Sequence, residues 1–107
     1  MVPIASRVLQ TALGDMRIEL FLPERLYGDV ACRYRIIGPR TKKEARAMGV
    51  DGFQALQLVM TRIAADLRAS PEFEAGGLRW LDRENPGFPL PEIIEDAGWT
   101  VDQQKRG

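Results

Sequence analysis

The sequence predicts a small α+β domain, in which a three- to four-stranded antiparallel meander packs against one long helix. Three segments that alternate apolar and polar residues come first in the chain, and glycine or proline residues separate them. A longer segment with a helical apolar stripe follows them. Consecutive strands with short connections are typical of an antiparallel meander, so we expect one sheet with the helix packed on it.

The three predicted strands cover residues 4–13, 16–22 and 29–37. Gly14-Asp15 is expected to form the tight turn between the first two, because glycine accepts the positive φ of hairpin turns. Pro23 ends the second strand, since proline cannot donate to the ladder. We expect a loop through Tyr27 and Gly28 to lead into the third strand.

The third strand has two distinct faces. One face carries Ala31, Arg33 and Arg35, and the other, apolar face carries Val30, Cys32, Tyr34 and Ile36. Cys32 is therefore expected to be a small core residue rather than a nucleophile, because the chain has no histidine to generate a thiolate.

Two helices are predicted next. Thr41-Lys42-Lys43-Glu44 has the form of a capping box, which predicts a short helix ending at Met48. The main helix is expected from about residue 51 to residue 70, with Asp51 as its N-cap and Pro71 ending it. Its apolar stripe is expected to consist of Phe53, Leu56, Val59, Met60, Ile63 and Leu67.

The C-terminal part is less regular. Residues 78–81 are expected to form a fourth strand or an extended edge, and proline-rich residues 85–91 to wrap the core with Phe88 inserted. Residues 92–97 are expected to form two short helical turns, with Trp99 docked behind them. The chain is thus predicted to be one domain over residues 1–102, followed by a frayed polar tail at 103–107.

The charges are polarised along the chain, although the net charge is zero. Residues 1–50 hold 9 Lys and Arg against 5 Asp and Glu, whereas residues 51–107 hold 6 against 10. The basic residues gather in one segment, and they define the candidate binding residues: Arg33, Arg35, Arg40, Lys42, Lys43 and Arg46.

The residue types argue against most catalytic chemistry. One cysteine and no histidine give no usual zinc or iron–sulfur ligand set, so neither a metal site nor a cofactor is expected. No spacing singles out a carboxylate pair for acid–base catalysis, and no catalytic residue is assigned. The N-terminal residues lack the pattern of a signal peptide, and no apolar run could span a bilayer. We therefore expect a cytoplasmic protein.

Four short motifs together resemble a family of small uncharacterised bacterial domains. They are Cys32-Arg33-Tyr34-Arg35-Ile36-Ile37-Gly38-Pro39, Gly49-Val50-Asp51 with Gln54-Ala55-Leu56, Leu78-Arg79-Trp80 and Gly87-Phe88-Pro89. The resemblance covers roughly residues 6 to 91 and implies a bacterial soluble domain. It implies no activity and no site residue.

Three functions follow as hypotheses. The preferred one is a non-enzymatic protein-binding module of the immunity, inhibitor or accessory-subunit type, acting through its polarised charge on an unknown protein or on a second copy. The alternative is a nucleic-acid or anionic-ligand binder that uses the basic segment 33–46, although zero net charge argues against nucleic acid. The third is a small carboxylate-dependent enzyme with a site between Asp51 and the 85–91 loop.

Overall fold

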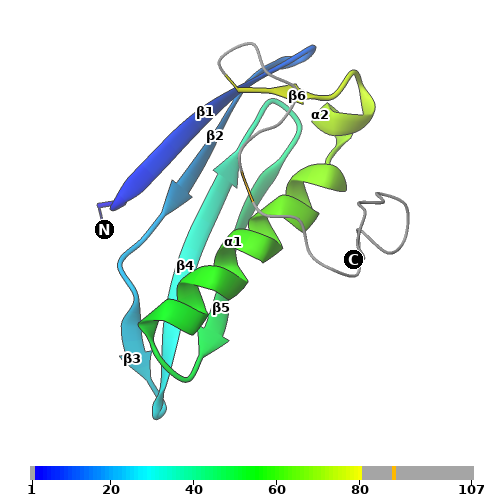
Figure 1. Ribbon diagram of the computed structural model, residues 1–107. Helices are drawn as coiled ribbons and strands as arrows, with labels where there is room; N and C mark the ends of the chain where they lie inside the picture. The colour runs from blue at the N-terminus through cyan, green and yellow to red at the C-terminus, as the bar shows by residue number, and fades with distance from the viewer. Residues whose placement is uncertain (1, 81–87, 89–107) are drawn as a thin grey trace, which may run out of the picture.

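The computed structural model describes residues 2–80 and 88, which form one antiparallel sheet with a long helix across one face (Figure 1). The helices are α1 (Gly52–Arg68) and α2 (Pro71–Glu74). The strands are β1 (Ala5–Thr11), β2 (Gly14–Leu20), β3 (Glu24–Leu26), β4 (Asp29–Ile37), β5 (Lys42–Gly49) and β6 (Leu78–Arg79). The α+β class is confirmed, but the sheet has six strands rather than three or four.

β4 is the central strand of the sheet. β5 pairs with it along its whole length, from Val30 to Ile37. β2 and β3 therefore share the other edge of β4. Between these two strands, the backbone N–H of Phe21 donates to the carbonyl of Arg33 at 3.0 Å. β1 pairs with β2, and the short β6 pairs with β1, so the spatial order is β6–β1–β2–β4–β5, with β3 in line with β2.

The three predicted strands are all present. The third is β4, which has the predicted bounds, and its apolar face is buried as predicted. The first hairpin differs by two residues, because Thr11 pairs with Gly14 and the turn is formed by residues 12–13 rather than by Gly14-Asp15. Gly14 is instead the first residue of β2, with a φ of 133°.

The segment before β4 is a strand rather than the predicted loop. Leu26 pairs with Asp29, which leaves Tyr27 and Gly28 as a two-residue hairpin turn. Their φ angles are 55° and 85°, and turns of type I′ require positive φ at both positions. Glycine adopts this conformation readily, whereas Tyr27 does so against its preference.

The predicted short helix over residues 41–48 is wrong, because this segment is strand β5. The hydroxyl of Thr41 does not cap a helix; it donates to the carboxylate of Glu72 at 2.6 Å. Ala45, Ala47 and Gly49 lie on the side of β5 that packs beneath α1, where small side chains permit a close approach. At Gly49 a Cβ atom would lie only 2.5 Å from the backbone nitrogen of Ala55. Pairing with β4 and packing against α1 thus override a weak local helix signal.

Helix α1 begins where the sequence predicts. The carboxylate of Asp51 accepts the N–H of Gln54 at 2.9 Å, and the Gln54 side chain accepts the N–H of Val50 at 2.7 Å. The predicted N-cap role of Asp51 is therefore confirmed, whereas Gln54 reaches the N–H of Val50, one residue before the N-cap, rather than that of Asp51 as in a full capping box.

The buried face of α1 is rotated from the predicted stripe. Phe53 is 84% exposed, and Leu56 and Met60 are only half-buried. The helix residues that are buried are Ala55, Val59, Ile63, Ala64 and Leu67. The two alanines were missed because they add little hydrophobicity, yet they bring the helix close to the sheet.

Asp51→Ala is expected to lower the free energy of unfolding by about 1 kcal/mol, because it leaves N–H groups of the first turn without an acceptor. Asp51→Asn and Asp51→Ser are the matched controls and are expected to be nearly neutral, since both side chains cap helices well. Urea unfolding of the three variants checks this. Equal losses in all three would contradict a capping role.

The C-terminal expectations are partly tested. Residues 78–79 form the short edge strand β6, and Phe88 is buried in the core as predicted. Trp80 is half-buried, with the guanidinium carbon of Arg7 at 3.6 Å from its ring centroid. The short turns at 92–97, Trp99 and the tail at 103–107 lie outside the described residues. Within the described part of the chain, no helix is both long and apolar enough to traverse a lipid bilayer.

Candidate functional site

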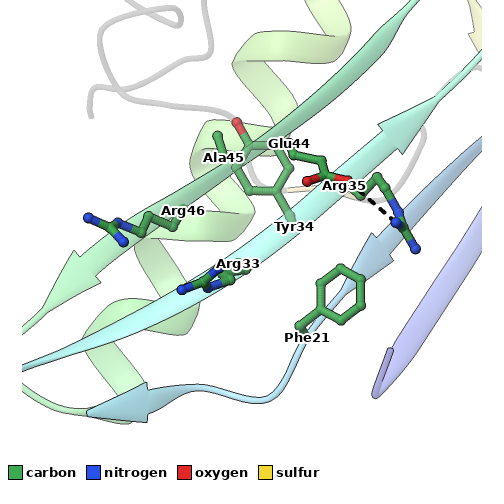
Figure 2. A pocket seen from close by; sticks show the side chains of 7 residues that line it. All are labelled: Phe21, Arg33, Tyr34, Arg35, Glu44, Ala45 and Arg46. Carbon is green, nitrogen blue, oxygen red and sulfur yellow. Dashed lines mark hydrogen bonds and ion pairs between the residues drawn. The ribbon is translucent and has the colours of Figure 1, made fainter. Parts of the chain in front are cut away.

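The candidate site is the face of the sheet opposite α1. Side chains alternate across a strand, and Tyr34 and Ile36 of β4 are buried in the core with the helix. Arg33 and Arg35 therefore point to the opposite face, which we call helix-free because no helix of residues 2–80 lies on it. The register of β5 adds Lys42, Glu44 and Arg46 to this face. We call the group Arg33, Arg35, Glu44 and Arg46 the basic face (Figure 2).

Arg33 and Arg46 are direct cross-strand neighbours. Gly38 and Thr41, just beyond the paired strands, form a hydrogen-bonded pair, in which the N–H of Gly38 donates to the carbonyl of Thr41 at 2.7 Å. Hydrogen-bonded and non-hydrogen-bonded pairs alternate along the strands, so Arg33–Arg46, five pairs further on, is a non-hydrogen-bonded pair with Cα atoms about 4.5 Å apart. In agreement, the carbonyl of Arg33 accepts from Phe21 on the other side of β4. Like charges directly opposite each other destabilise a sheet.

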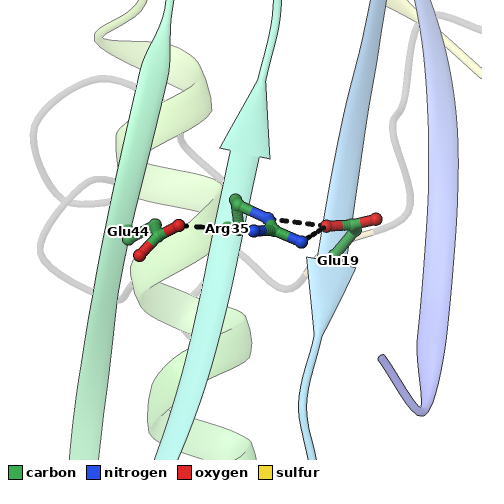
Figure 3. Close-up of polar contacts among 3 residues, drawn as sticks. All are labelled: Glu19, Arg35 and Glu44. Atoms are coloured by element: carbon green, nitrogen blue, oxygen red, sulfur yellow. Dashed lines mark hydrogen bonds and ion pairs between the residues drawn. The ribbon is translucent and has the colours of Figure 1, made fainter. Parts of the chain in front are cut away.

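Arg35 is neutralised by carboxylates on both sides (Figure 3). Its Nε and Nη2 atoms each lie 2.7 Å from one oxygen of Glu19 on β2, and its Nη1 lies 3.4 Å from Glu44 on β5. The hydrogen bond to Glu19 raises the pKa of the Arg35 guanidinium further. Arg35 is thus held in place as a fixed, compensated charge.

The other two arginines are compensated much less. Within the described part of the chain, Arg33 has one ion pair, with Glu24 at 3.6 Å, and both side chains are about half exposed. Arg46 is exposed, and no carboxylate of residues 2–80 or 88 lies within ion-pair distance of its guanidinium. The positive charge of the basic face is therefore concentrated at the Arg33–Arg46 pair.

A shallow hollow of about 470 Å³ lies on this face. Arg33, Arg35, Glu44 and Arg46 line it, together with Phe21 (Figure 2). Phe21 is only 6% exposed, and the guanidinium carbon of Arg35 lies 5.4 Å from the centroid of its ring. The hollow thus offers guanidinium groups to a ligand and very little aromatic surface.

The six basic residues predicted from the sequence do not form one cluster. Lys43 points to the helix side, where its Nζ lies 2.9 Å from Asp66 of α1. Arg40 lies in the turn between β4 and β5, and its backbone N–H donates to Glu72. Lys42 shares the helix-free face but lies opposite Ile37 at the end of the strand. Only Arg33, Arg35 and Arg46 line the hollow.

The sequence reasoning missed Phe21, Glu19 and Glu44 as parts of this face. A signal for the first two exists, because Arg17, Glu19 and Phe21 occupy the non-core positions of the second predicted strand. Glu44 was assigned to a helix cap, and only the pairing of β5 with β4 places it beside Arg35.

Residues with metal-binding or nucleophilic character are not gathered in the described part of the chain. No group of three or more Cys, Asp and Glu side chains suited to a metal ion occurs there. Cys32 is fully buried, its thiol donates to the carbonyl of Phe21 at 3.4 Å, and burial raises its pKa. The prediction that Cys32 is a core residue is confirmed.

The core also contains a polar cluster at the edge of α1. The hydroxyl of Tyr34 donates to Asp66, which also pairs with Lys43. Burial, and then the hydrogen bond to Asp66, raise the pKa of Tyr34. A tyrosine held neutral in this way is a structural donor between β4 and α1 rather than a base.

Comparison with other proteins shows a family but no activity. Neither curated proteins nor solved structures give a significant match to this chain. The model of one family, described as a domain of unknown function (DUF6968), matches residues 5–90. That match covers β1 through β6, the basic face and Phe88. The chain belongs to the DUF6968 family of domains of unknown function.

Proposed function

We propose that this chain is a non-enzymatic protein-binding module whose basic face binds an acidic surface of its partner. The observation that carries the proposal is the Arg33–Arg46 pair. Two guanidinium groups lie directly opposite each other on a sheet face that no described helix covers, and Arg46 has no carboxylate partner among the described residues. A carboxylate placed between them would relieve their repulsion and form charge-assisted hydrogen bonds.

The rest of the face supports recognition of a protein surface. Arg35 is fixed between Glu19 and Glu44, so its position is set before a partner binds. The shallow hollow suits a side chain of a partner better than an enclosed small molecule. A cytoplasmic location in a bacterium is part of the same proposal, and the single buried thiol Cys32 is compatible with it.

Nucleic acid fits this face less well. Proteins that bind single strands combine a basic groove with aromatic rings on which bases stack. The two aromatic residues at the hollow, Phe21 and Tyr34, are both buried, so neither ring is open for a base to stack on. Binding of an anionic ligand or a nucleic acid therefore remains the alternative outcome of the test below.

The carboxylate-enzyme hypothesis has no specific observation in its favour. Phe88 lines a small hollow with Ile18, Met60 and Ile63, beside the later turns of α1 rather than beside Asp51 at its start. The rest of the 85–91 loop lies outside the described residues, so this hypothesis stays a prediction from the sequence.

The test measures binding of fluorescent poly-L-glutamate at low and moderate salt by anisotropy. We expect binding that weakens as salt rises, because exposed charges are screened. The double variant R33A/R46A is expected to lose about tenfold in affinity, the equivalent of about 1.4 kcal/mol. The matched control R25A/R40A also removes two exposed arginines, but away from the basic face, and is expected to bind as the wild type does.

Two outcomes would overturn the proposal. Equal losses in the two double variants would mean that only the overall charge matters. Tighter binding of a mixed-sequence oligonucleotide than of poly-L-glutamate, lost in R33A/R46A, would favour the nucleic-acid alternative.

A further inference from the structure

The strand β5 forms one edge of the sheet. Among the described residues it pairs only with β4, and in Figure 3 it is the outermost strand on the side of Glu44. It is eight residues long, above the common strand length of about five to six, and its charged side chains restrict which strands can pair with it. Its outer edge therefore presents a row of backbone groups that another strand could pair with.

The hydrogen bonds fix which backbone groups these are. The N–H of Gly38 bonds to the carbonyl of Thr41, so the ladder between β4 and β5 uses the odd-numbered residues of β5. The even-numbered residues turn their N–H and C=O groups outward. In agreement, the carbonyl of Arg46 accepts from the side chain of Arg62 rather than from β4. The outward groups belong to Lys42, Glu44, Arg46 and Met48.

Three registers centre a two-fold symmetric self-pairing on the middle residues of β5, Glu44, Ala45 and Arg46. In a two-fold symmetric antiparallel pair, the strand is centred on one residue, and positions equally far from that residue lie opposite each other. Centring on Glu44 would oppose two glutamates, and centring on Arg46 would oppose two arginines. Centring on Ala45 places Glu44 of each copy opposite Arg46 of the other.

We infer that a second copy of this chain adds to the edge of β5, with the two-fold axis at Ala45. In this register the backbone of Glu44 in one copy is hydrogen-bonded to that of Arg46 in the other, and both side chains lie on the helix-free face. The two-fold symmetry makes this pair occur twice. The outermost pairs then place Lys42 of one copy opposite Met48 of the other, so no like charges face each other. Each Arg46 thereby gains the carboxylate partner that it lacks among the described residues of its own chain. This pairing competes with the acidic partner of the proposed function for Arg46, and the mass of the chain and its binding of poly-L-glutamate test the two separately.

One contact of the single chain must adapt to this pairing. Arg62 reaches the carbonyl of Arg46 at 3.4 Å from an exposed position on α1. This bond is long, and a carbonyl has two lone pairs, so the N–H of Glu44 from the second copy can share or replace it. The remaining outward groups of β5 have no protein partner in the described residues.

The test is the mass of the full chain by light scattering after size exclusion, from micromolar to millimolar concentrations. The wild type is expected to reach twice the 12.0 kDa of one chain. Glu44→Arg opposes two arginines across the interface and Arg46→Glu opposes two glutamates, so each variant alone is expected to have the mass of one chain. An equimolar mixture of the two restores opposite charges at both positions and is expected to regain the doubled mass.

Arg25→Glu is the matched control for Arg46→Glu. It makes the same change of charge at an exposed position of β3, so it should leave the doubled mass intact. Circular dichroism of each variant separates misfolding from dissociation. The inference is overturned if the wild type keeps the mass of one chain at every concentration. It is also overturned if the two charge variants dimerise alone, or if folded variants fail to pair when mixed.

Discussion

Ile63→Ala is expected to lower the free energy of unfolding by about 2–5 kcal/mol, which is a large share of the stability of a domain of this size. Ile63 is only 1% exposed and belongs to the core cluster that joins α1 to the sheet. Ile18 on β2 and Phe88 lie beside it. The truncation removes apolar contacts and leaves a cavity. The helix cannot move in to fill it, because Val59 and Leu67 hold α1 against the sheet before and after Ile63.

Phe53→Ala is the matched control on the same helix. The sequence pattern assigns Phe53 to the core stripe, but its side chain is 84% exposed, so its truncation is expected to cost less than about 0.5 kcal/mol. Urea unfolding of both variants measures the difference. Similar losses for Ile63→Ala and Phe53→Ala would show that the helix presents another face to the sheet.

The second large effect is expected at Glu72, a fully buried carboxylate in α2. Its two oxygens accept the N–H of Arg40 at 2.7 Å and the hydroxyl of Thr41 at 2.6 Å, so it ties α2 to the turn between β4 and β5. Glu72→Ala removes both of these part-buried hydrogen bonds and leaves a gap at a fully buried position, so the free energy of unfolding is expected to fall by about 1–3 kcal/mol. Glu74→Ala, which changes an exposed neighbour in the same helix, is expected to be nearly neutral.

Glu72 also makes the stability depend on pH. Burial raises its pKa, but the hydrogen bonds from Thr41 and Arg40 outweigh burial, and the pKa is lowered from the ordinary value of 4.5. A lowered pKa in the folded state means that the contribution of Glu72 is complete above the unfolded-state value. It is lost as the pH falls below about 4.5 and through the folded-state pKa.

The pH dependence is checked with Glu72→Gln, which keeps the shape of the side chain and cannot ionise. The wild type is expected to exceed this variant in stability at neutral pH, and the difference is expected to shrink in acid. Urea unfolding at several pH values measures it. A difference that stays constant down to acid pH would contradict the role of the ionised carboxylate.

The amino-acid sequence predicts those elements whose signals are local. The bounds of β4 follow from an uninterrupted alternation between turn residues, and Asp51 caps α1 because capping depends on residues within one helical turn. The burial of Cys32 follows from its place in the same alternation. For each of these, the deciding interactions lie within a few residues of the chain.

Residues 41–49 were predicted wrongly because distant partners decide their structure. Thr41 has the local form of a helix cap, yet its hydroxyl bonds to Glu72, 31 residues later in the chain. The small residues of β5 carry a weak apolar signal, and their role becomes visible only when α1 packs on them. Pairing with β4 then decides between a helix and a strand.

The candidate site shows the same division. The sequence by itself determined the α+β class, the capped helix and the concentration of positive charge between residues 33 and 46. Only the tertiary structure decided that Lys43 points to α1, that Arg35 is neutralised by Glu19 and Glu44, and that Arg33 and Arg46 lie directly opposite each other. The physical reason is that composition sets how much charge a segment carries, whereas the register between strands sets which charges meet.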